Sequence, residues 1–105
     1  MDYMIVWKIA GDKLVCDAGA SAGPPAWIEG SKGHTFPKGG GLPGRAWASG
    51  GTVEFTPNVQ TLDAGAYMRL DLAKQCGIKG SAAVLKGDAV IECGCSSELS
   101  SPPAL

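Results

Sequence analysis

The chain carries little charge and has no excess of either sign. Only 18% of its 105 residues are Asp, Glu, Lys or Arg, and its formal net charge is -1. This balance gives no electrostatic basis for binding nucleic acid or anionic lipid, since both attract clusters of Lys and Arg. No apolar run approaches the roughly 18 residues of a membrane-spanning helix. The first residues also lack the basic flank and small-residue cleavage site of a secretory signal.

Histidine is nearly absent, and no set of catalytic residues stands out. His34 is the only histidine, and its spacing from Ser31, Ser49 or a thiol does not indicate a triad. The ten carboxylates are scattered, with no close pair suited to acid–base chemistry. We interpret them mostly as solvated faces and helix caps. The sequence therefore predicts that the protein is not an enzyme.

The four cysteines are fewer than a disulfide scaffold needs. We expect reduced, mostly buried thiols and a reducing intracellular compartment, such as the cytoplasm or a plastid. Cys93 and Cys95 lie two apart on a predicted strand, so they would face the same way and could bind one metal ion together. Zinc would need two more ligands from Cys16, Cys76 and His34, at spacings that match no common zinc pattern. Core cysteines are the default interpretation, and we predict no metal and no cofactor.

Glycine is what the chain has in abundance. Eight of its sixteen glycines lie between Gly19 and Gly44, together with four of its seven prolines. We expect residues 18–44 to form one long connection, of a kind that often serves as a lid, binding loop or docking surface. Residues 39–44 satisfy the pattern G-x-G-x-x-G, but they lack the preceding strand and the long following helix that dinucleotide binding requires. Nucleotide binding is therefore not expected.

The remaining segments predict two hairpins, a short strand and one main helix. The hairpins pair residues 3–8 with 13–16 and residues 78–85 with 89–95, around the turn signals Gly11-Asp12 and Gly87-Asp88. A short helix over residues 44–49 ends at Gly50-Gly51, and a short strand follows over residues 52–55.

We expect the main helix to run from about Ala64 to Cys76, with Asp63 as its N-cap and Gly77 as its end. Met68, Leu72 and Cys76 would form its core stripe. Alternation along the last strand separates two sets of side chains, Ile91, Cys93 and Cys95 on one face and Val90, Glu92 and Gly94 on the other.

Four segments, which follow one another in the right order over a little more than half of the chain, resemble motifs of the GAF domain family. Residues 41–50 are similar to G-L-P-G-R-x-W-x-S-G, and residues 53–59 to a run that usually ends in Asp-Val, with Asn58 where Asp is more usual. Residues 67–78 resemble F-x-R-x-x-x-A-x-x-x-G-I, and residues 89–94 resemble the closing strand G-V-L-E-F-G.

The resemblance implies an α+β fold in which an antiparallel sheet carries one main helix and the long Gly-rich connection. Residues 1–95 would be a single GAF-like domain, and residues 96–105 a flexible Ser/Pro tail. In this family a small molecule sits between the sheet and the long connection. The corresponding lining here would be Trp27, Phe36, Gly39, Gly40, Gly41, Arg45, Trp47 and Phe55. The alternative, that the aromatic residues only fill the core, stays open. The family's cyclic-nucleotide and bilin signatures are absent, so no ligand identity carries over.

The resemblance also suggests an incomplete covering of the sheet. GAF domains normally have a helix before the first strand and another after the last, whereas here the first strand is expected by Tyr3 and a Ser/Pro tail follows Cys95. We therefore expect one sheet face without helical cover, completed by another copy or by a larger complex. The favoured function is an accessory, structural subunit docked onto a larger protein complex, with an organellar photosynthetic complex as one candidate host. The alternative is a regulatory GAF domain that senses a small effector in the cleft between loop and sheet.

Overall fold

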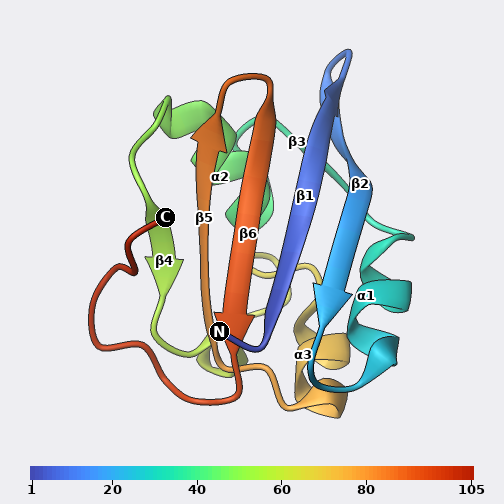
Figure 1. Cartoon of the computed structure of the whole chain (residues 1–105), viewed down its shortest axis with the longest axis vertical. Helices are drawn as coiled ribbons and strands as arrows, with labels where there is room; N and C mark the ends of the chain where they lie inside the picture. The colour runs from blue at the N-terminus through green and yellow to red at the C-terminus, as the bar shows by residue number, and fades with distance from the viewer.

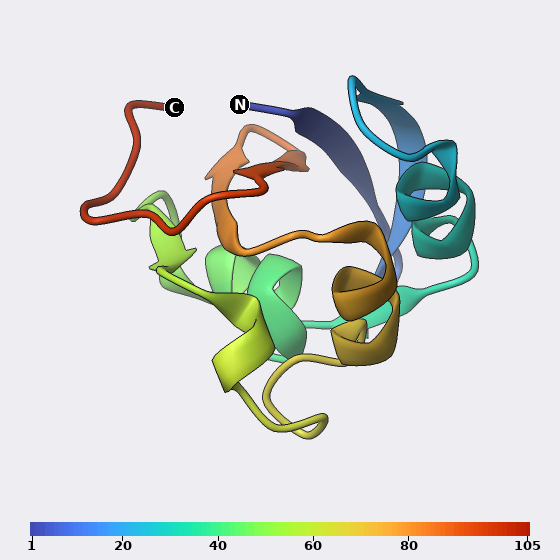
Figure 2. The same cartoon turned by 90° about the horizontal axis from the view of Figure 1, so that it is seen from below.

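The computed structural model, which describes all residues from Met1 to Leu105, has one curled antiparallel sheet with three helices on one of its faces (Figures 1 and 2). The strands, in sheet order, are β3 (Thr35–Pro37), β2 (Lys13–Ser21), β1 (Tyr3–Ala10), β6 (Ala89–Cys95), β5 (Gly80–Lys86) and β4 (Glu54–Thr56). The helices are α1 (Pro25–Ser31), α2 (Gly41–Ser49) and α3 (Leu70–Cys76), with a short 3-10 turn, η1 (Val59–Thr61). The predicted α+β class with an antiparallel sheet is confirmed.

The two predicted hairpins are present, and they meet at the centre of the sheet. β1 pairs with β2 and β5 with β6, and the two hairpins join where β1 lies antiparallel to β6, with Tyr3 opposite Gly94. Tyr3, Ile5 and Trp7 are buried on the helix side, and the register places Glu92 opposite Ile5 there. The predicted division of the last strand into two faces is therefore confirmed.

Two glycines allow the backbone to approach its neighbours closely. A Cβ atom on Gly94 would collide with the Tyr3 ring, and one on Gly44 would collide with the carbonyl oxygen of Pro37. Gly44 thus lets α2 pack directly against the end of β3. This packing accounts for the last glycine of the G-x-G-x-x-G pattern without a ligand.

The expectation of one long connection over residues 18–44 is wrong. β2 continues to Ser21, and α1 and β3 follow before α2 begins. The second half of β2 has no β-branched residue to indicate a strand, but it pairs with β1 as far as Tyr3 opposite Ser21. α1 starts with Pro25 in its first turn, a position that proline favours.

The main helix is shorter than predicted, because it begins only at Leu70. The Asp63 carboxylate does accept from the Ala66 N–H at 2.8 Å, but that bond closes a separate turn. The backbone leaves the helical conformation at Arg69 (φ -97°, ψ 26°), whose side chain is drawn into the core. Met68, expected in the core stripe, is 41% exposed. Gly77 ends the helix in the left-handed conformation, as predicted.

The residues after Cys95 form no helix or strand, and their first part is held against the sheet. The Gly80 N–H donates to the carbonyl of Ser97 at 3.0 Å, and the Leu99 N–H donates to that of Pro57 at 3.1 Å. The tail then runs past β4 (Figure 1). No helix of the protein has the length and apolar character needed to cross a membrane.

We predict that Gly94→Ala lowers the free energy of unfolding by about 1–3 kcal/mol, because the added methyl group overpacks the contact with the Tyr3 ring. Gly33→Ala is the control, since a Cβ there would meet only the Gly30 carbonyl oxygen at 3.6 Å. Urea unfolding of both variants checks this. Equal stabilities would contradict this, because both the Tyr3 ring and the Gly80 carbonyl oxygen would then have to yield to the methyl group.

Candidate functional site

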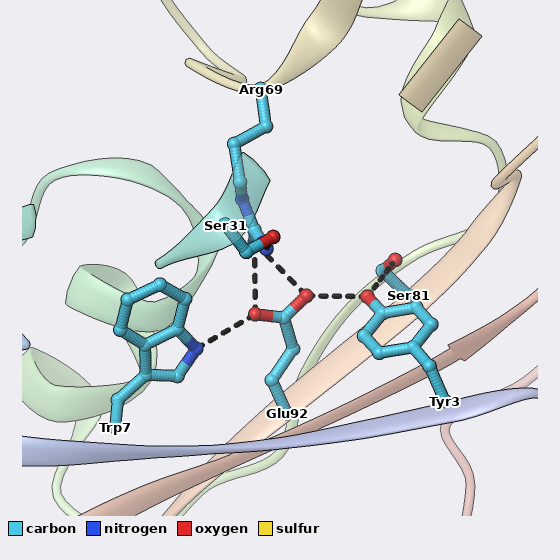
Figure 3. Close-up of polar contacts among 6 residues, drawn as sticks. All are labelled: Tyr3, Trp7, Ser31, Arg69, Ser81 and Glu92. Atoms are coloured by element: carbon cyan, nitrogen blue, oxygen red, sulfur yellow. Dashed lines mark hydrogen bonds and ion pairs between the residues drawn. The ribbon is translucent and has the colours of Figure 1, made fainter. Parts of the chain in front are cut away.

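A buried ion pair lies between the sheet and the helices. Arg69, the residue just before α3, points toward the sheet and meets Glu92, which projects from the middle of β6 (Figure 3). Arg69 Nη2 lies 2.8 Å from Glu92 Oε1 and 2.9 Å from Oε2. The two residues are 1% and 0% exposed, so this pair is shielded from solvent and counterions.

Neighbouring strands supply further hydrogen bonds to the Glu92 carboxylate. The Trp7 indole N–H donates to Oε1 at 2.8 Å, and the Tyr3 hydroxyl donates to Oε2. Because the Tyr3 proton is used in that bond, the Ser81 hydroxyl, 2.8 Å away, donates to the Tyr3 oxygen. Both carboxylate oxygens therefore have two donors each, as a buried charge requires.

Aromatic rings enclose the Arg69 guanidinium. Its central carbon lies 4.8 to 5.4 Å from the centroids of four rings, those of Trp27, Phe36, Trp7 and Tyr67. These distances are within the range of cation–π attraction. Its Nη1 also donates to the Ser31 hydroxyl at 3.1 Å. We call the four rings with Arg69 and Glu92 the cation box.

Three polar atoms of the cation box have no hydrogen-bond partner. They are Trp27 Nε1, the Tyr67 hydroxyl and Arg69 Nε, all buried. Unpaired buried polar groups are uncommon in folded proteins and cost free energy. The box is therefore not fully satisfied by the chain's own groups.

Burial and charge shift the pKa of groups in the box and next to it. Burial, and then the charge of Glu92, raise the pKa of Tyr3 well above its ordinary value, and burial also raises that of Tyr67. Burial, the largest effect, lowers the pKa of the Arg69 guanidinium, but Glu92, Tyr67 and Tyr3 together raise it above its ordinary value. Burial, together with the Arg69 charge, lowers the pKa of His34. Tyr67 in the box and Tyr3 beside it therefore keep their protons to a higher pH than a free tyrosine.

The structure brings together only some of the residues that the resemblance assigned to ligand binding. Trp27 and Phe36 belong to the cation box, and Gly41 lies close against the Phe36 ring. Gly39 and Gly40 form the turn before α2.

The other three predicted residues lie apart from the box. On α2, Arg45 donates to the carbonyl of Ala66 at 3.2 Å, and Trp47 packs partly against the core. The register pairs Phe55 with Ala82, which lies opposite Cys93. Phe55 therefore lies on the helix-free face and shares no site with the box.

Sequence reasoning missed the ion pair itself. Interpreting Glu92 as a solvated carboxylate is wrong, because alternation places it on the core face with Val90. The alternation could have revealed this, because Val90 and Glu92 lie two apart on β6 and therefore share the face that is buried. Ser31, considered as a nucleophile partner of His34, instead accepts from Arg69, and the His34 side chain makes no hydrogen bond.

The hollows of the protein lie on the helix-free face rather than between sheet and helices. The larger, of about 610 Å³, is lined by residues that include Met1, Met4, Ala20, Cys93 and Leu105. The smaller, of about 190 Å³, lies over Met4, Val6 and the alanines of β2. The box itself contains no detected cavity.

The candidate metal ligands do not assemble into a zinc site. No three His, Cys, Asp or Glu side chains gather anywhere in the chain. All four cysteines are free thiols. Cys93 and Cys95 do share the helix-free face, but Cys16 lies opposite Trp7 on the helix side and Cys76 is on α3.

We predict that Arg69→Met lowers the free energy of unfolding by about 3–5 kcal/mol, because it leaves a buried carboxylate unpaired. The double variant Arg69→Met/Glu92→Gln should regain part of this loss, since it removes both charges. Urea unfolding of the wild type, both single variants and the double variant gives the coupling between the two residues. Additive losses would mean that the pair does not couple.

The raised pKa values of Tyr3 and Tyr67 predict a loss of stability in alkali. Above about pH 10 an unfolded tyrosine releases its proton while the buried one keeps it, so unfolding is favoured by about 1.4 kcal/mol per pH unit for each residue. Stability is fully present below this pH. Urea unfolding between pH 8 and 11 measures how steeply the free energy of unfolding falls with pH. The Tyr67 hydroxyl has no hydrogen-bond partner, so Tyr67→Phe should reduce this slope by the contribution of one tyrosine. An unchanged slope in Tyr67→Phe would contradict this.

Comparison with known proteins adds no identity to this geometry. No family model matches the chain, and no curated protein matches it in sequence. The cation box and the helix-free face are therefore the features that bear on function.

Proposed function

We propose that the chain is a non-catalytic, GAF-like module that acts as an accessory subunit and docks onto a larger protein complex through the helix-free face of its sheet. One observation carries the proposal. The helix side of the sheet is filled by the cation box, whereas both hollows of the protein lie on the other face. The helix-free face of the sheet, and not the space between sheet and helices, is thus available for recognition.

Two rows of uncharged side chains cross the helix-free face. The register aligns Phe55, Ala82, Cys93, Met4 and Ala20 in one row and Val84, Ile91, Val6 and Ala18 in the next. Ala82, Cys93 and Val84 are buried, so the exposed part of the two rows lies over β1 and β2. There Ala18 and Ala20 lower the surface beside Met4, which is 52% exposed. An exposed apolar patch beside a hollow is typical of an interaction site.

Positive charge borders the apolar rows on one side. The next row holds Lys8 and Lys86, which both flank Ala89 in the register. The fitting partner is therefore a protein surface with protruding apolar side chains and carboxylates placed opposite these two lysines. A second copy of the chain would present the same face, whose two apolar rows hold no carboxylate to pair with these lysines.

A second candidate function has one observation in its favour. The three unpartnered polar atoms around Arg69 would be satisfied by a small effector that enters between sheet and helices. Trp27 and Phe36, with the nearby Gly41, would then contact it, as the GAF resemblance implies. Native mass spectrometry of the protein from its source tests this candidate. A bound metabolite whose release changes the fluorescence of Trp27 supports it, and a ligand-free protein contradicts it.

The docking proposal predicts that Met4→Glu abolishes partner binding while Met68→Glu preserves it. Both methionines are exposed, at 52% and 41%, but Met68 precedes α3 on the helix side. The wild type, Met4→Glu and Met68→Glu are each used to capture partners from the source cells. A partner that only Met4→Glu fails to capture is then purified. Its dissociation constant should then rise at least about tenfold for Met4→Glu.

Two results would contradict the docking proposal. One is equal binding by both variants, which would place the interface elsewhere. The other is sedimentation of the wild type as a dimer that Met4→Glu dissociates, which would make a second copy the occupant of this face.

A further inference from the structure

Three sulfur-bearing side chains line the larger hollow of the helix-free face. Met4 and Cys93 lie directly opposite each other where β1 pairs with β6, and Met1 lines the same hollow. Zinc takes thiolate and imidazole ligands, of which the spacing around Cys93 and Cys95 offers too few. Thioether sulfurs add donors for softer metal ions.

The pairing of Met4 with Cys93 suits a shared metal ion. Directly opposed residues have Cβ atoms about 4.5–5.5 Å apart, and a metal–sulfur bond of about 2.3 Å brings two sulfurs on one ion to roughly 4–5 Å. Methionine has flexible side-chain torsions, and Met4 and Met1 are 52% and 59% exposed. Their thioethers can therefore turn toward Cys93 without movement of the sheet.

The thiol of Cys93 has no other role in the structure. It is 4% exposed, lines the hollow and makes no hydrogen bond. Its neighbour on the same face differs in this respect, since the Cys95 thiol donates to the carbonyl of Ser97 at 3.2 Å. Cys93 is thus a buried, unpartnered donor in a hollow whose other two sulfurs belong to exposed methionine side chains.

We propose that Cys93, Met4 and Met1 bind one monovalent soft metal ion, of the class to which Cu(I) and Ag(I) belong. A set of one thiol and two thioethers offers neither the oxygen ligands of Mg²⁺ and Ca²⁺ nor the nitrogen and thiolate ligands of zinc, and it selects Cu(I). On binding, a sulfur–metal bond forms as the Cys93 S–H bond breaks, and the proton leaves to solvent. The charge of the site does not change. This inference does not depend on the docking proposal.

The test uses Ag(I) as a redox-stable probe, titrated into the reduced protein with a competing chelator and followed by native mass spectrometry. The wild type should bind one ion tightly and release about one proton. Cys93→Ser should lower the affinity about a hundredfold or more, and Met4→Leu about tenfold. Cys16→Ser, which removes a free thiol on the other face, should change it less than about twofold.

Each result decides the proposal. An unchanged affinity in Met4→Leu shows that the thioethers do not contribute, and an unchanged affinity in Cys93→Ser places the ion elsewhere. Tight binding of Zn²⁺ by the same residues would also overturn the assignment. If Cys93→Ser fails to fold, Met4→Leu still decides, since Met4 is half exposed and leucine keeps its apolar character.

Discussion

The buried ion pair between Arg69 and Glu92 constrains most of the interior. Glu92 stands on β6 at the centre of the sheet, so its charge would be unpaired and buried if Arg69 did not reach it from the helix layer. The two charges also hold their neighbours, because Tyr3 and Trp7 orient toward the carboxylate and Ser31 toward the guanidinium. β1, α1, β6 and the start of α3 are therefore tied to one point. A hydrophobic pair could supply equal stability, but it would not fix these directions.

The same pair decides which face of the sheet can meet another molecule. Four aromatic rings pack around the guanidinium, and they occupy the space where the GAF resemblance places a ligand. An effector would have to satisfy the unpartnered atoms of the box and leave the charge pair intact. The helix-free face has no such restriction where it lies over β1 and β2, since Met4, Ala18 and Ala20 are exposed there. For this reason we favour docking over ligand sensing.

The features that depend on neighbours in sequence were predictable. The two hairpins, the helix ends at Gly50 and Gly77 and the two faces of β6 all follow from local patterns. The second half of β2, the late start of α3 and the ion pair depend on distant contacts instead. The helix-compatible segment is interrupted at Arg69 because its side chain pairs with Glu92, 23 positions later in the chain. No local sequence pattern specifies that contact. The resemblance did include both partners, within the segments 67–78 and 89–94, but it assigned them no contact.

Met4 lies where the two uses proposed for the helix-free face overlap. It stands in the apolar row beside Cys93 and also lines the larger hollow. A docked partner needs only its apolar surface, whereas a metal ion needs its sulfur. Leucine keeps the first property and removes the second, while glutamate removes both. Comparing partner binding and metal binding in Met4→Leu and Met4→Glu thus separates recognition of an apolar surface from coordination by sulfur. A bound ion would draw the Met4 side chain toward Cys93 and change the surface presented to the partner. The two binding events would then be coupled, and each would alter the affinity of the other by the same factor.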